Sequence, residues 1–298
     1  MKAYHDILKQ VLAEGNTSGN RTDTGAIKTT GAMFKHNMQD GFPLLTTKKI
    51  NPNTVFAELE FFIKGNKSKQ WLKDRKCNIW NDWCNPEKVP YGHDDETKAK
   101  MTEEDDLGRV YGVQWRDWGG HSTKTSEKLG EDTWKYTFND IPGIDQLKNT
   151  IETLKTNPND RRNIVMAWNP AELDQMALPP CHFGFQITSD GEYVDLTWFQ
   201  RSVDTFLGLP FNIASYGMLL ELIAKTVGMK ARYLVGQLVD VHIYVNHIDQ
   251  VNEQLSRTEK KLPTLVLPDD IDIFDWEYNQ YEMLDYDPHP FIKAPIAV

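Results

Sequence analysis

The sequence predicts a single α+β domain, on the strength of three observations. The chain has 298 residues, of which 40% are hydrophobic and 26% charged, the composition of a globular protein that buries a core. Segments with helical spacing and segments with strand-like alternation interleave along it. No internal repeat, low-complexity tract or convincing domain boundary separates them, so one domain spanning residues 1–298 is expected.

Two helices and a strand are expected in the first part of the chain. Residues 4–12 place their apolar side chains on one helical face, and Gly15 marks the end of that helix. The threonine- and glycine-rich residues 21–34 are typical of a loop that enters a strand or hairpin. Residues 54–63 are apolar enough for a buried helix, although they contain Glu58 and Glu60.

Two polar segments interrupt this pattern, near residues 86–106 and 121–135. Well-patterned sequence resumes after each of them, so they are expected to be solvated surface insertions rather than linkers.

The second half of the chain predicts three helices and two strands. Helical patterns cover residues 145–156, 214–227 and 245–255, and the second of these is almost wholly apolar. Residues 163–168 (NIVMAW) predict a buried strand, and residues 193–199 (YVDLTWF) alternate as a strand does.

Charge and cysteine content exclude several classes of protein. Lysine and arginine number 33 against 43 aspartates and glutamates, a net charge of −10, so nucleic-acid binding would need a local basic patch. No apolar run approaches the roughly 18 residues of a membrane span, and the charged N-terminal segment does not resemble a signal peptide. Three scattered cysteines do not make a disulfide scaffold, which favours a cytoplasmic location.

Cys181 is the first candidate for chemistry. It follows two prolines and precedes His182 in ALPPCHFGFQ. A cysteine acts as a nucleophile when an electropositive, partly open setting favours its thiolate. Taken alone, the pair is weak evidence, because a buried structural cysteine is the more frequent case. Cys77 and Cys84 fit that structural interpretation better, because their spacing without neighbouring histidines makes no obvious zinc site.

Arginines are the second signal. Arg21, Arg109, Arg161, Arg162 and Arg201 stand beside small, polar or hydroxyl residues in an otherwise acidic chain. A planar guanidinium binds phosphate through two parallel hydrogen bonds, so these residues are candidates for capturing an oxyanion. For any one of them, pairing with a surface carboxylate is the alternative.

The segment QRSVDTFLGLPFNIASYG supplies further polar candidates just before an apolar helix. Asn212 could cap that helix or hold a heterocycle, because its amide offers both a donor and an acceptor. His242 and Tyr244 share one face if their segment is a strand, where half-buried structural roles are the alternative. Dinucleotide, phosphate-loop and zinc motifs are absent from the sequence.

The motifs ALPPCHFGFQ and QRSVDTFLGLPFNIASY resemble those of thymidylate synthases. The resemblance covers nearly the whole chain, because RTDTG, FPLLTTKK, IWNDW, VYGVQWRDW, NDRRNIVMAWNPAEL, VHIYVNHIDQ and DPHPFIKAPIAV follow in the family's order. It implies a large mixed, twisted β-sheet flanked by helices, and a homodimer formed through that sheet with shared active sites. It implies a methyltransferase that converts deoxyuridylate to thymidylate with 5,10-methylenetetrahydrofolate as cosubstrate and no metal.

The resemblance also assigns roles to residues. Cys181 matches the nucleophile that adds to carbon 6 of uracil, and Glu58, Tyr111, His182 and Asn212 match catalytic positions around it. The positions that match deoxyuridylate ligands are Arg21, Arg161, Arg162, Arg201, Ser202, Asp204, Asn212, His242 and Tyr244, with Arg161 and Arg162 donated by the other subunit. The folate pocket matches Trp80, Asp204, Leu207, Gly208, Phe211 and the C-terminal lid that includes Ala297.

Several positions depart from the family pattern. Arg109 stands where LGPVYG has proline, Leu238 and Val239 replace a glycine pair, and ELEFF replaces ELLWF. Asn51 and Asn53 follow TTKK, where basic or aromatic residues are usual. These changes bear on folate placement and on the fate of the methylene intermediate.

Two alternatives therefore remain. One is a deoxyuridylate hydroxymethylase of the same fold, in which water quenches the intermediate; an aspartate in place of Asn212 would instead indicate cytosine. The other is a catalytically silent nucleotide- or RNA-binding homologue, which the joint presence of Cys181, Glu58 and Asn212 disfavours.

Overall fold

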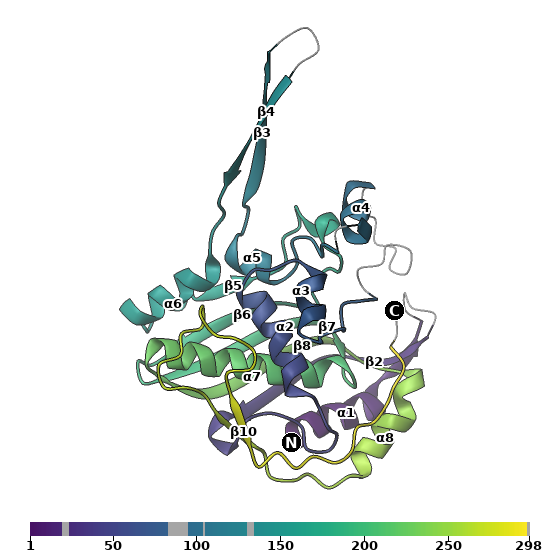
Figure 1. Ribbon diagram of the computed structural model, residues 1–298. Coiled ribbons are helices and arrows are strands. Elements are labelled where there is room, and N and C mark those ends of the chain that lie inside the picture. The colour runs from purple at the N-terminus through teal and green to yellow at the C-terminus, as the bar shows by residue number, and fades with distance from the viewer. Residues whose placement is uncertain (20–23, 83–94, 104, 130–133, 297–298) are drawn as a thin grey trace.

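A six-stranded mixed β-sheet forms the centre of the computed structural model, which describes residues 1–19, 24–82, 95–103, 105–129 and 134–296 (Figure 1). The strand order is β1 (Asn16–Ser18), β2 (Ala26–Asn37), β8 (Lys230–Tyr244), β7 (Tyr193–Asp204), β6 (His182–Ser189) and β5 (Ile164–Met166). β7 and β8 are parallel and all other neighbours are antiparallel. The prediction of an α+β fold with a large mixed sheet is confirmed.

Helices cover one face of this sheet. The longest, α7 (Gly208–Val227), packs on β7 and β8, and α2 (Pro52–Ile63) packs on α7. α1 (Lys2–Glu14) packs along β2. α6 (Gln146–Thr156) and α8 (Ile248–Ser256) lie at the periphery. The short helices α3 (Lys69–Asp74) and α5 (Gly112–Arg116) lie beside α2. Within the described residues, no helix combines the length and the apolar content that crossing a membrane requires.

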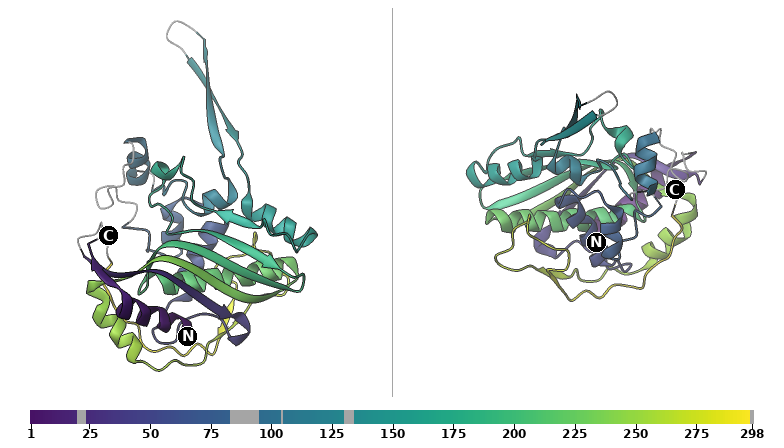
Figure 2. Two further views of the ribbon diagram at one scale, coloured as in Figure 1. Left: turned by 180° about the vertical axis from the view of Figure 1, so that it is seen from behind. Right: turned by 45° about the horizontal axis from the view of Figure 1, so that its top comes forward.

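Among the segments that the structure describes, no helix covers the opposite face of the sheet, which is seen from behind in Figure 2. Register places Met33, Phe199, Gln237 and Val239 on this face, since paired residues share a side of a sheet. Met33 is 60% exposed and Val239 49% exposed. An apolar sheet face left open in this way is unusual for a chain that acts alone.

Tight packing between α7 and the sheet sets the position of both. The ring of Tyr216 on α7 stacks on Trp198 of β7 at 5.3 Å between centroids. A Cβ on Gly236 of the adjacent β8 would lie 2.4 Å from Trp198, so only glycine allows the neighbouring strand to approach this indole.

Most predicted elements are present, with informative shifts in their boundaries. α7 begins at Gly208 rather than near residue 214, because Pro210 stands in the first helical turn, where its missing N–H costs no hydrogen bond. α2 is capped by Asn51, whose side chain accepts from the Asn53 N–H, and Pro52 opens it. The predicted helix over 245–255 begins as a 3-10 turn and becomes α8 at Ile248. The strand β6 was not predicted.

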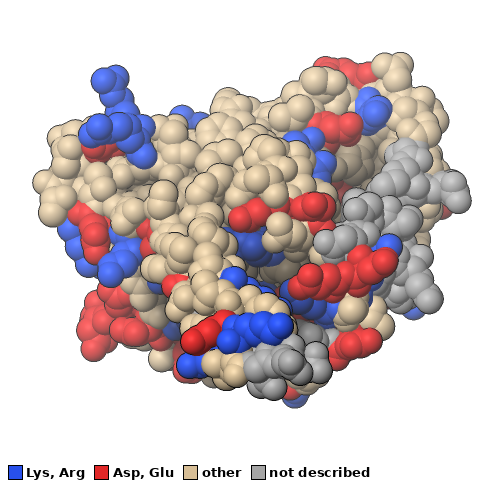
Figure 3. All heavy atoms as spheres, turned by 90° about the horizontal axis from the view of Figure 1, so that it is seen from above, with Lys and Arg blue, Asp and Glu red and all other residues tan. Residues whose placement is uncertain are grey.

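The two polar segments take different forms. The first contains α4 (Asp95–Glu103), and Asp106 after it is buried in an ion pair with Lys67 at 2.8 Å. The second forms β3 (His121–Lys128) and pairs with β4 (Trp134–Ile141), so this hairpin continues past the predicted boundary at residue 135 and projects from the body (Figures 1 and 2). Seen from the hairpin end, acidic and basic side chains are interspersed rather than gathered into a patch of one sign (Figure 3).

Candidate active site

Cys181 lies at the end of the Pro179–Pro180 loop, where the chain enters β6. Its side chain is partly exposed, whereas Cys77 is buried. The Cys181 backbone N–H donates to the hydroxyl of Tyr111 at 2.8 Å, and its carbonyl accepts from the Arg201 N–H at 2.9 Å. The register between β6 and β7 shifts between His182 and Gly184, a local irregularity that re-aims side chains beside the cysteine.

Arg201 on β7 holds this loop from the other side. Its Nε donates to the Pro180 carbonyl at 2.9 Å and its guanidinium also donates to the Pro179 carbonyl at 3.0 Å. The guanidinium carbon lies 5.0 Å from the ring centroid of Trp168. In the described part of the chain no carboxylate forms an ion pair with Arg201, so its positive charge remains available to an anion near Cys181.

Aromatic residues close the space behind Cys181. The ring of His182 lies 4.4 Å from that of Tyr111, and its Nδ1 is 2.9 Å from the Tyr216 hydroxyl. Burial lowers the pKa of His182 to about 3, so this imidazole is neutral. Burial, and secondly the nearby Cys181, raise the pKa of Tyr111 well above its ordinary value, which keeps its phenol protonated.

Glu58 on α2 completes this group, which we call the nucleophile cluster (Cys181, Tyr111, His182, Tyr216 and Glu58). Its Oε1 accepts from the indole Nε1 of Trp80 at 2.7 Å. Burial raises the pKa of Glu58 to about 7, and the hydrogen bond from Trp80 opposes that shift. A carboxyl group with such a pKa gains and loses a proton readily near neutral pH.

A second group of polar residues lies along the ends of β7 and β8 and at the start of α7; we call it the β7–β8 edge (Gln200, Ser202, Asp204, Asn212, His242 and Tyr244). The indole N–H of Trp198 donates to Gln200 Oε1 at 3.1 Å, and Gln200 Nε2 donates to Asn212 Oδ1 at 3.0 Å. An indole nitrogen can only donate, so this series of hydrogen bonds identifies the oxygen and the nitrogen of each side-chain amide. The Asn212 Nδ2 donor is therefore turned away from Gln200.

The rest of the β7–β8 edge is set by strand pairing. Asp204 on β7 lies opposite His242 on β8, and Ser202 lies opposite Asp240. Asp204 Oδ1 accepts from the backbone N–H groups of Phe206 and Leu207 at 3.0 and 3.1 Å, which shapes the turn into α7. The rings of His242 and Tyr244 are 5.1 Å apart, as expected for two residues on one strand face.

The residues matched to a folate pocket surround the start of α7. Gly208 lies against Asp204 and Asn212, since a Cβ there would be 3.6 Å from the Asp204 Cβ and 3.9 Å from Asn212 Oδ1. Leu207 and Phe211 pack partly buried against the core, and Trp80 lies against Glu58. Arg21, Ala297 and Cys84 lie outside the described residues.

Arg161 and Arg162 are not brought together with Cys181. They precede β5, and Gln186 Nε2 near the far end of β6 donates to the Arg161 carbonyl at 2.8 Å. Gln186 is five positions beyond Cys181 along the strand, roughly 17 Å at about 3.3 Å per residue. Arg162 points outward and pairs with Asp160 at 2.6 Å.

The positions that depart from the family pattern have structural partners. Arg109 pairs with Glu172 at 2.6 Å and with Asp117 at 3.2 Å, the carboxylate-paired alternative of the sequence analysis. Glu60 accepts from Arg75 at 3.3 Å and from the Tyr278 N–H at 3.2 Å. Asn53 accepts from the Tyr281 hydroxyl at 2.7 Å.

The sequence analysis did not predict three features of the site. They are the hydrogen bond from Gln200 to Asn212, the contact of Tyr216 with His182, and the hydrogen bonds by which Arg201 holds the loop before Cys181. Two of them had a detectable signal. Tyr216 follows Asn212 by four residues, the spacing that places two side chains on one helical face. Gln200 alternates with Ser202 along the strand. Nothing in the sequence indicates that Arg201 holds the carbonyls of Pro179 and Pro180.

A partly exposed cysteine, held between a tyrosine and an arginine with a proton-exchanging carboxyl group nearby, is typical of an enzyme that forms a covalent bond to its substrate. Comparison with known proteins shows which family within this class of enzymes the chain resembles. The thymidylate synthase family model matches residues 2–298. A protein of Corynebacterium aurimucosum named thymidylate synthase is 40% identical over 296 residues, which cover 99% of this chain and 97% of that protein.

The chain belongs to the thymidylate synthase family. Members of this family are methyltransferases that act on deoxyuridylate with methylenetetrahydrofolate as cosubstrate. Among the residues that the structure describes, no three His, Cys, Asp or Glu side chains are grouped to hold a metal ion.

Proposed function

We propose that this chain is a thymidylate synthase, which converts deoxyuridylate to thymidylate and takes both the one-carbon unit and a hydride from 5,10-methylenetetrahydrofolate. The observation that carries the proposal is the setting of Cys181. Its thiol is accessible, its backbone is held on both sides by Tyr111 and Arg201, and Glu58 lies within electrostatic reach of Tyr111.

The reaction requires a nucleophile because carbon 5 of uracil is unreactive. Addition of the Cys181 thiolate to carbon 6 turns the ring into an enolate, and carbon 5 then attacks the one-carbon unit. The positive charge of Arg201 and of the phosphate-binding arginines favours the thiolate. Loss of the carbon 5 proton lets the bond between the one-carbon unit and the folate nitrogen break, which leaves tetrahydrofolate and an exocyclic methylene on the ring. A hydride from tetrahydrofolate then adds to that methylene as the thiolate departs from carbon 6, which gives thymidylate, dihydrofolate and the free cysteine.

Glu58 is the group suited to moving protons at the base. Its pKa of about 7 lets it exist in both protonation states under physiological conditions. His182 is unsuited to this task, because burial holds its pKa near 3 and its Nδ1 faces the Tyr216 hydroxyl. We assign Glu58 to proton transfer and His182 to support of the cluster.

Asn212 is proposed to read the base. With its Oδ1 accepting from Gln200, its Nδ2 is free to donate to the oxygen at carbon 4 of uracil. Cytosine presents an amino group at that position, and two donors cannot pair. Arg201 and Ser202 would hold the phosphate, and His242 and Tyr244 the sugar.

We also propose that the active chain is a homodimer joined through the open face of the sheet. Two observations support this arrangement: the apolar side chains exposed on that face and the separation of Arg161 and Arg162 from Cys181. If each subunit donates these arginines across the interface, neither chain completes a site alone.

Product analysis tests the proposed function. Purified chain incubated with deoxyuridylate and methylenetetrahydrofolate should yield a nucleotide heavier by one methylene, together with dihydrofolate detected by its absorbance. A hydroxymethyl nucleotide formed without dihydrofolate would identify a hydroxymethylase instead. Nucleotide binding without any product would identify a silent homologue.

A further inference from the structure

Tyr111 holds the nucleophile, yet its own backbone is strained. Its φ of 26° and ψ of −85° are rare for a residue with a side chain. Such a conformation costs on the order of 1–3 kcal/mol and persists only where the surroundings enforce it. Because the Tyr111 hydroxyl accepts from the Cys181 N–H, whatever fixes the backbone of residues 109–112 also places the cysteine.

One side of this segment is fixed by close packing against α2. A Cβ on Gly112 would lie 2.1 Å from the Phe62 carbonyl oxygen, and the rings of Phe62 and Tyr111 stack at 4.8 Å. Packing on this side cannot prevent the segment from moving away from α2. A second restraint is needed on the opposite side.

Arg109 supplies contacts on that opposite side. Its Nε donates to Glu172 Oε2 at 2.6 Å and its Nη1 to Asp117 Oδ2 at 3.2 Å, while Nη2 donates to the Asp117 carbonyl. Asp117 caps the end of α5, and Glu172 opens the segment that runs to Met176 and on to Cys181. The Arg109 guanidinium therefore connects residue 109 to the end of α5 and to the segment that leads to Cys181.

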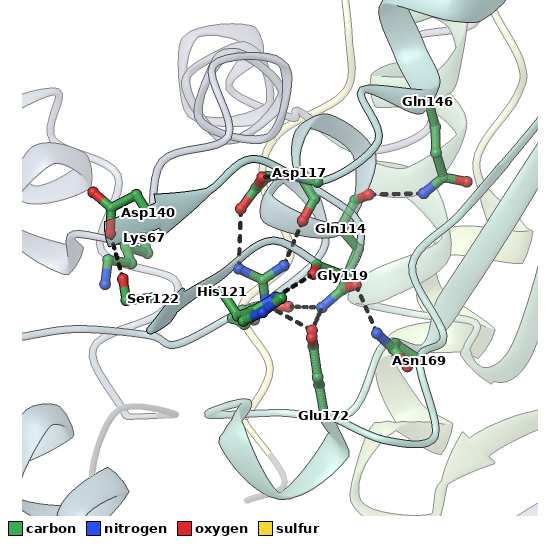
Figure 4. A network of polar contacts seen from close by, with 12 residues as sticks. Lys67, Gln114, Asp117, Gly119, His121, Ser122, Asp140, Gln146, Asn169 and Glu172 are labelled. Atoms are coloured by element: carbon green, nitrogen blue, oxygen red, sulfur yellow. Dashed lines mark hydrogen bonds and ion pairs between the residues drawn. The ribbon is translucent and has the colours of Figure 1, made fainter. Parts of the chain in front are cut away.

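Neighbouring polar groups reinforce this arrangement (Figure 4). The fully buried Gln114 donates to the same Glu172 oxygen at 2.6 Å and to the Arg109 carbonyl at 3.0 Å. Gln146 donates to the Gln114 carbonyl at 2.7 Å. Backbone pairing of Gly108 with Met176 joins the two segments directly, so a shift in one is passed to the other.

We propose that Arg109 is a positioning residue that, through Glu172 and Asp117, holds Tyr111 in the place where its hydroxyl orients Cys181. This inference rests on the proposed function, since it assumes that Cys181 is the nucleophile. Arginine suits the role because its planar group reaches two carboxylates and a carbonyl at once, which the single ammonium of lysine does not.

A double-mutant cycle tests the inference. Arg109→Ala should lower kcat by about tenfold and change KM for deoxyuridylate by less than about twofold, because a small displacement of a reacting group costs rate more than binding. In the Tyr111→Phe background, which lacks the hydroxyl, Arg109→Ala should lower kcat no further. The effect of Arg109→Ala on kcat would then differ about tenfold between the two backgrounds, which is within the range for residues that interact.

Arg116→Ala is the matched control. Arg116 is the last residue of α5, seven positions after Arg109; its side chain is 24% exposed against 19% for Arg109, and it pairs with Asp145 at 2.8 Å. Its side chain bonds to Asp145 and to the Ile63 carbonyl at the end of α2, and not to Glu172, which begins the segment that leads to Cys181. Its loss should lower the melting temperature without changing kcat, in either background.

The inference is overturned if Arg109→Ala and Tyr111→Phe have multiplicative effects on kcat, or if Arg109→Ala affects only stability, as Arg116→Ala does. Should Arg109→Ala fail to fold, Arg109→Lys and Glu172→Gln carry the same cycle with smaller perturbations. Cys181→Ser, measured alongside, separates the two claims: full activity in that variant refutes the proposed function, whatever Arg109 does.

Discussion

The nucleophile cluster and the β7–β8 edge are built in different ways. The nucleophile cluster packs a thiol, two tyrosines, a histidine and a carboxyl group among aromatic rings, and burial shifts the pKa of four of them. The β7–β8 edge consists of buried and half-buried polar side chains whose directions are fixed by strand register and by amide hydrogen bonds. Desolvation shifts the pKa values of the buried groups, whereas directed hydrogen bonds select which ligand binds. Chemistry and recognition thus use separate physical means within one site.

Cys181→Ser removes the reactive group of the nucleophile cluster and has the largest expected effect. A hydroxyl is far less acidic than a thiol, so turnover should fall by about 10³-fold or more. The dissociation constant for deoxyuridylate should change little, because the β7–β8 edge is untouched. Steady-state rates and calorimetric titration measure the two quantities. Cys77→Ser is the control, and substantial turnover in Cys181→Ser would remove Cys181 as nucleophile.

Mixing two inactive variants tests whether the phosphate end of the site is completed by a second chain. An Arg161→Ala/Arg162→Ala dimer and a Cys181→Ser dimer should each be inactive. After subunit exchange, each hybrid dimer contains one intact site. If exchange is random, about a quarter of the activity of the unmodified dimer should appear. No recovery, with exchange shown independently by mass spectrometry of intact dimers, would contradict the shared site.

Glu58→Gln separates proton transfer from binding. The amide keeps the Trp80 hydrogen bond but carries no proton to exchange, so kcat should fall by about 10²-fold or more. The titration with a midpoint near 7 should also disappear from the pH profile of kcat. If that titration persists in the variant, another group is responsible for it.

The same substitution has an opposite effect on stability. Burial raises the pKa of Glu58 to about 7 in the folded chain, so the folded state holds this proton more tightly than the unfolded state. Stability is therefore complete below the ordinary pKa and declines as pH rises through 7, by about 3 kcal/mol at most. Glu58→Gln should raise the melting temperature at pH 8 and leave it nearly unchanged at pH 4, which thermal unfolding at both values measures. An equal change at both would contradict the assigned pKa.

Asn212→Asp changes ligand selection at the β7–β8 edge and has the smallest expected effect. Loss of the donor should lower kcat/KM for deoxyuridylate by about 10- to 100-fold, since an unpaired buried polar group costs about 1–3 kcal/mol. Relative use of deoxycytidylate should rise, because a carboxylate accepts from its amino group. Competition between the two nucleotides measures this preference. An unchanged preference would show that Asn212 does not read the base.

Periodicity predicted the elements whose burial is one-sided and missed those with mixed surroundings. The helices α1 and α6 show their apolar faces in the sequence, whereas α2, which is buried from Val55 to Ile63, was predicted from its apolar content. β6 shows no such pattern, because HFGFQITS contains a glycine and its register with β7 shifts between His182 and Gly184. The full length of β8, fifteen residues, is visible only once β2 and β7 flank it.

The candidate site depended on a different kind of information. Composition and spacing raised Cys181, Asn212 and the arginines as candidates, but could not choose between chemistry and structure for any of them. The family resemblance assigned the roles. What neither predicted is how the side chains are held, because contacts such as His182 with Tyr216, or Arg109 with Glu172, join residues that are 34 and 63 positions apart.

A covalent complex tests most directly the claim that the nucleophile cluster attacks a base held by the β7–β8 edge. The chain is incubated with 5-fluoro-deoxyuridylate and methylenetetrahydrofolate, digested, and analysed by mass spectrometry. The fluorine blocks loss of the group at carbon 5, so the adduct should persist on the peptide that contains Cys181 and should be absent from Cys181→Ser. An adduct on another cysteine, or none despite tight nucleotide binding, would contradict the account.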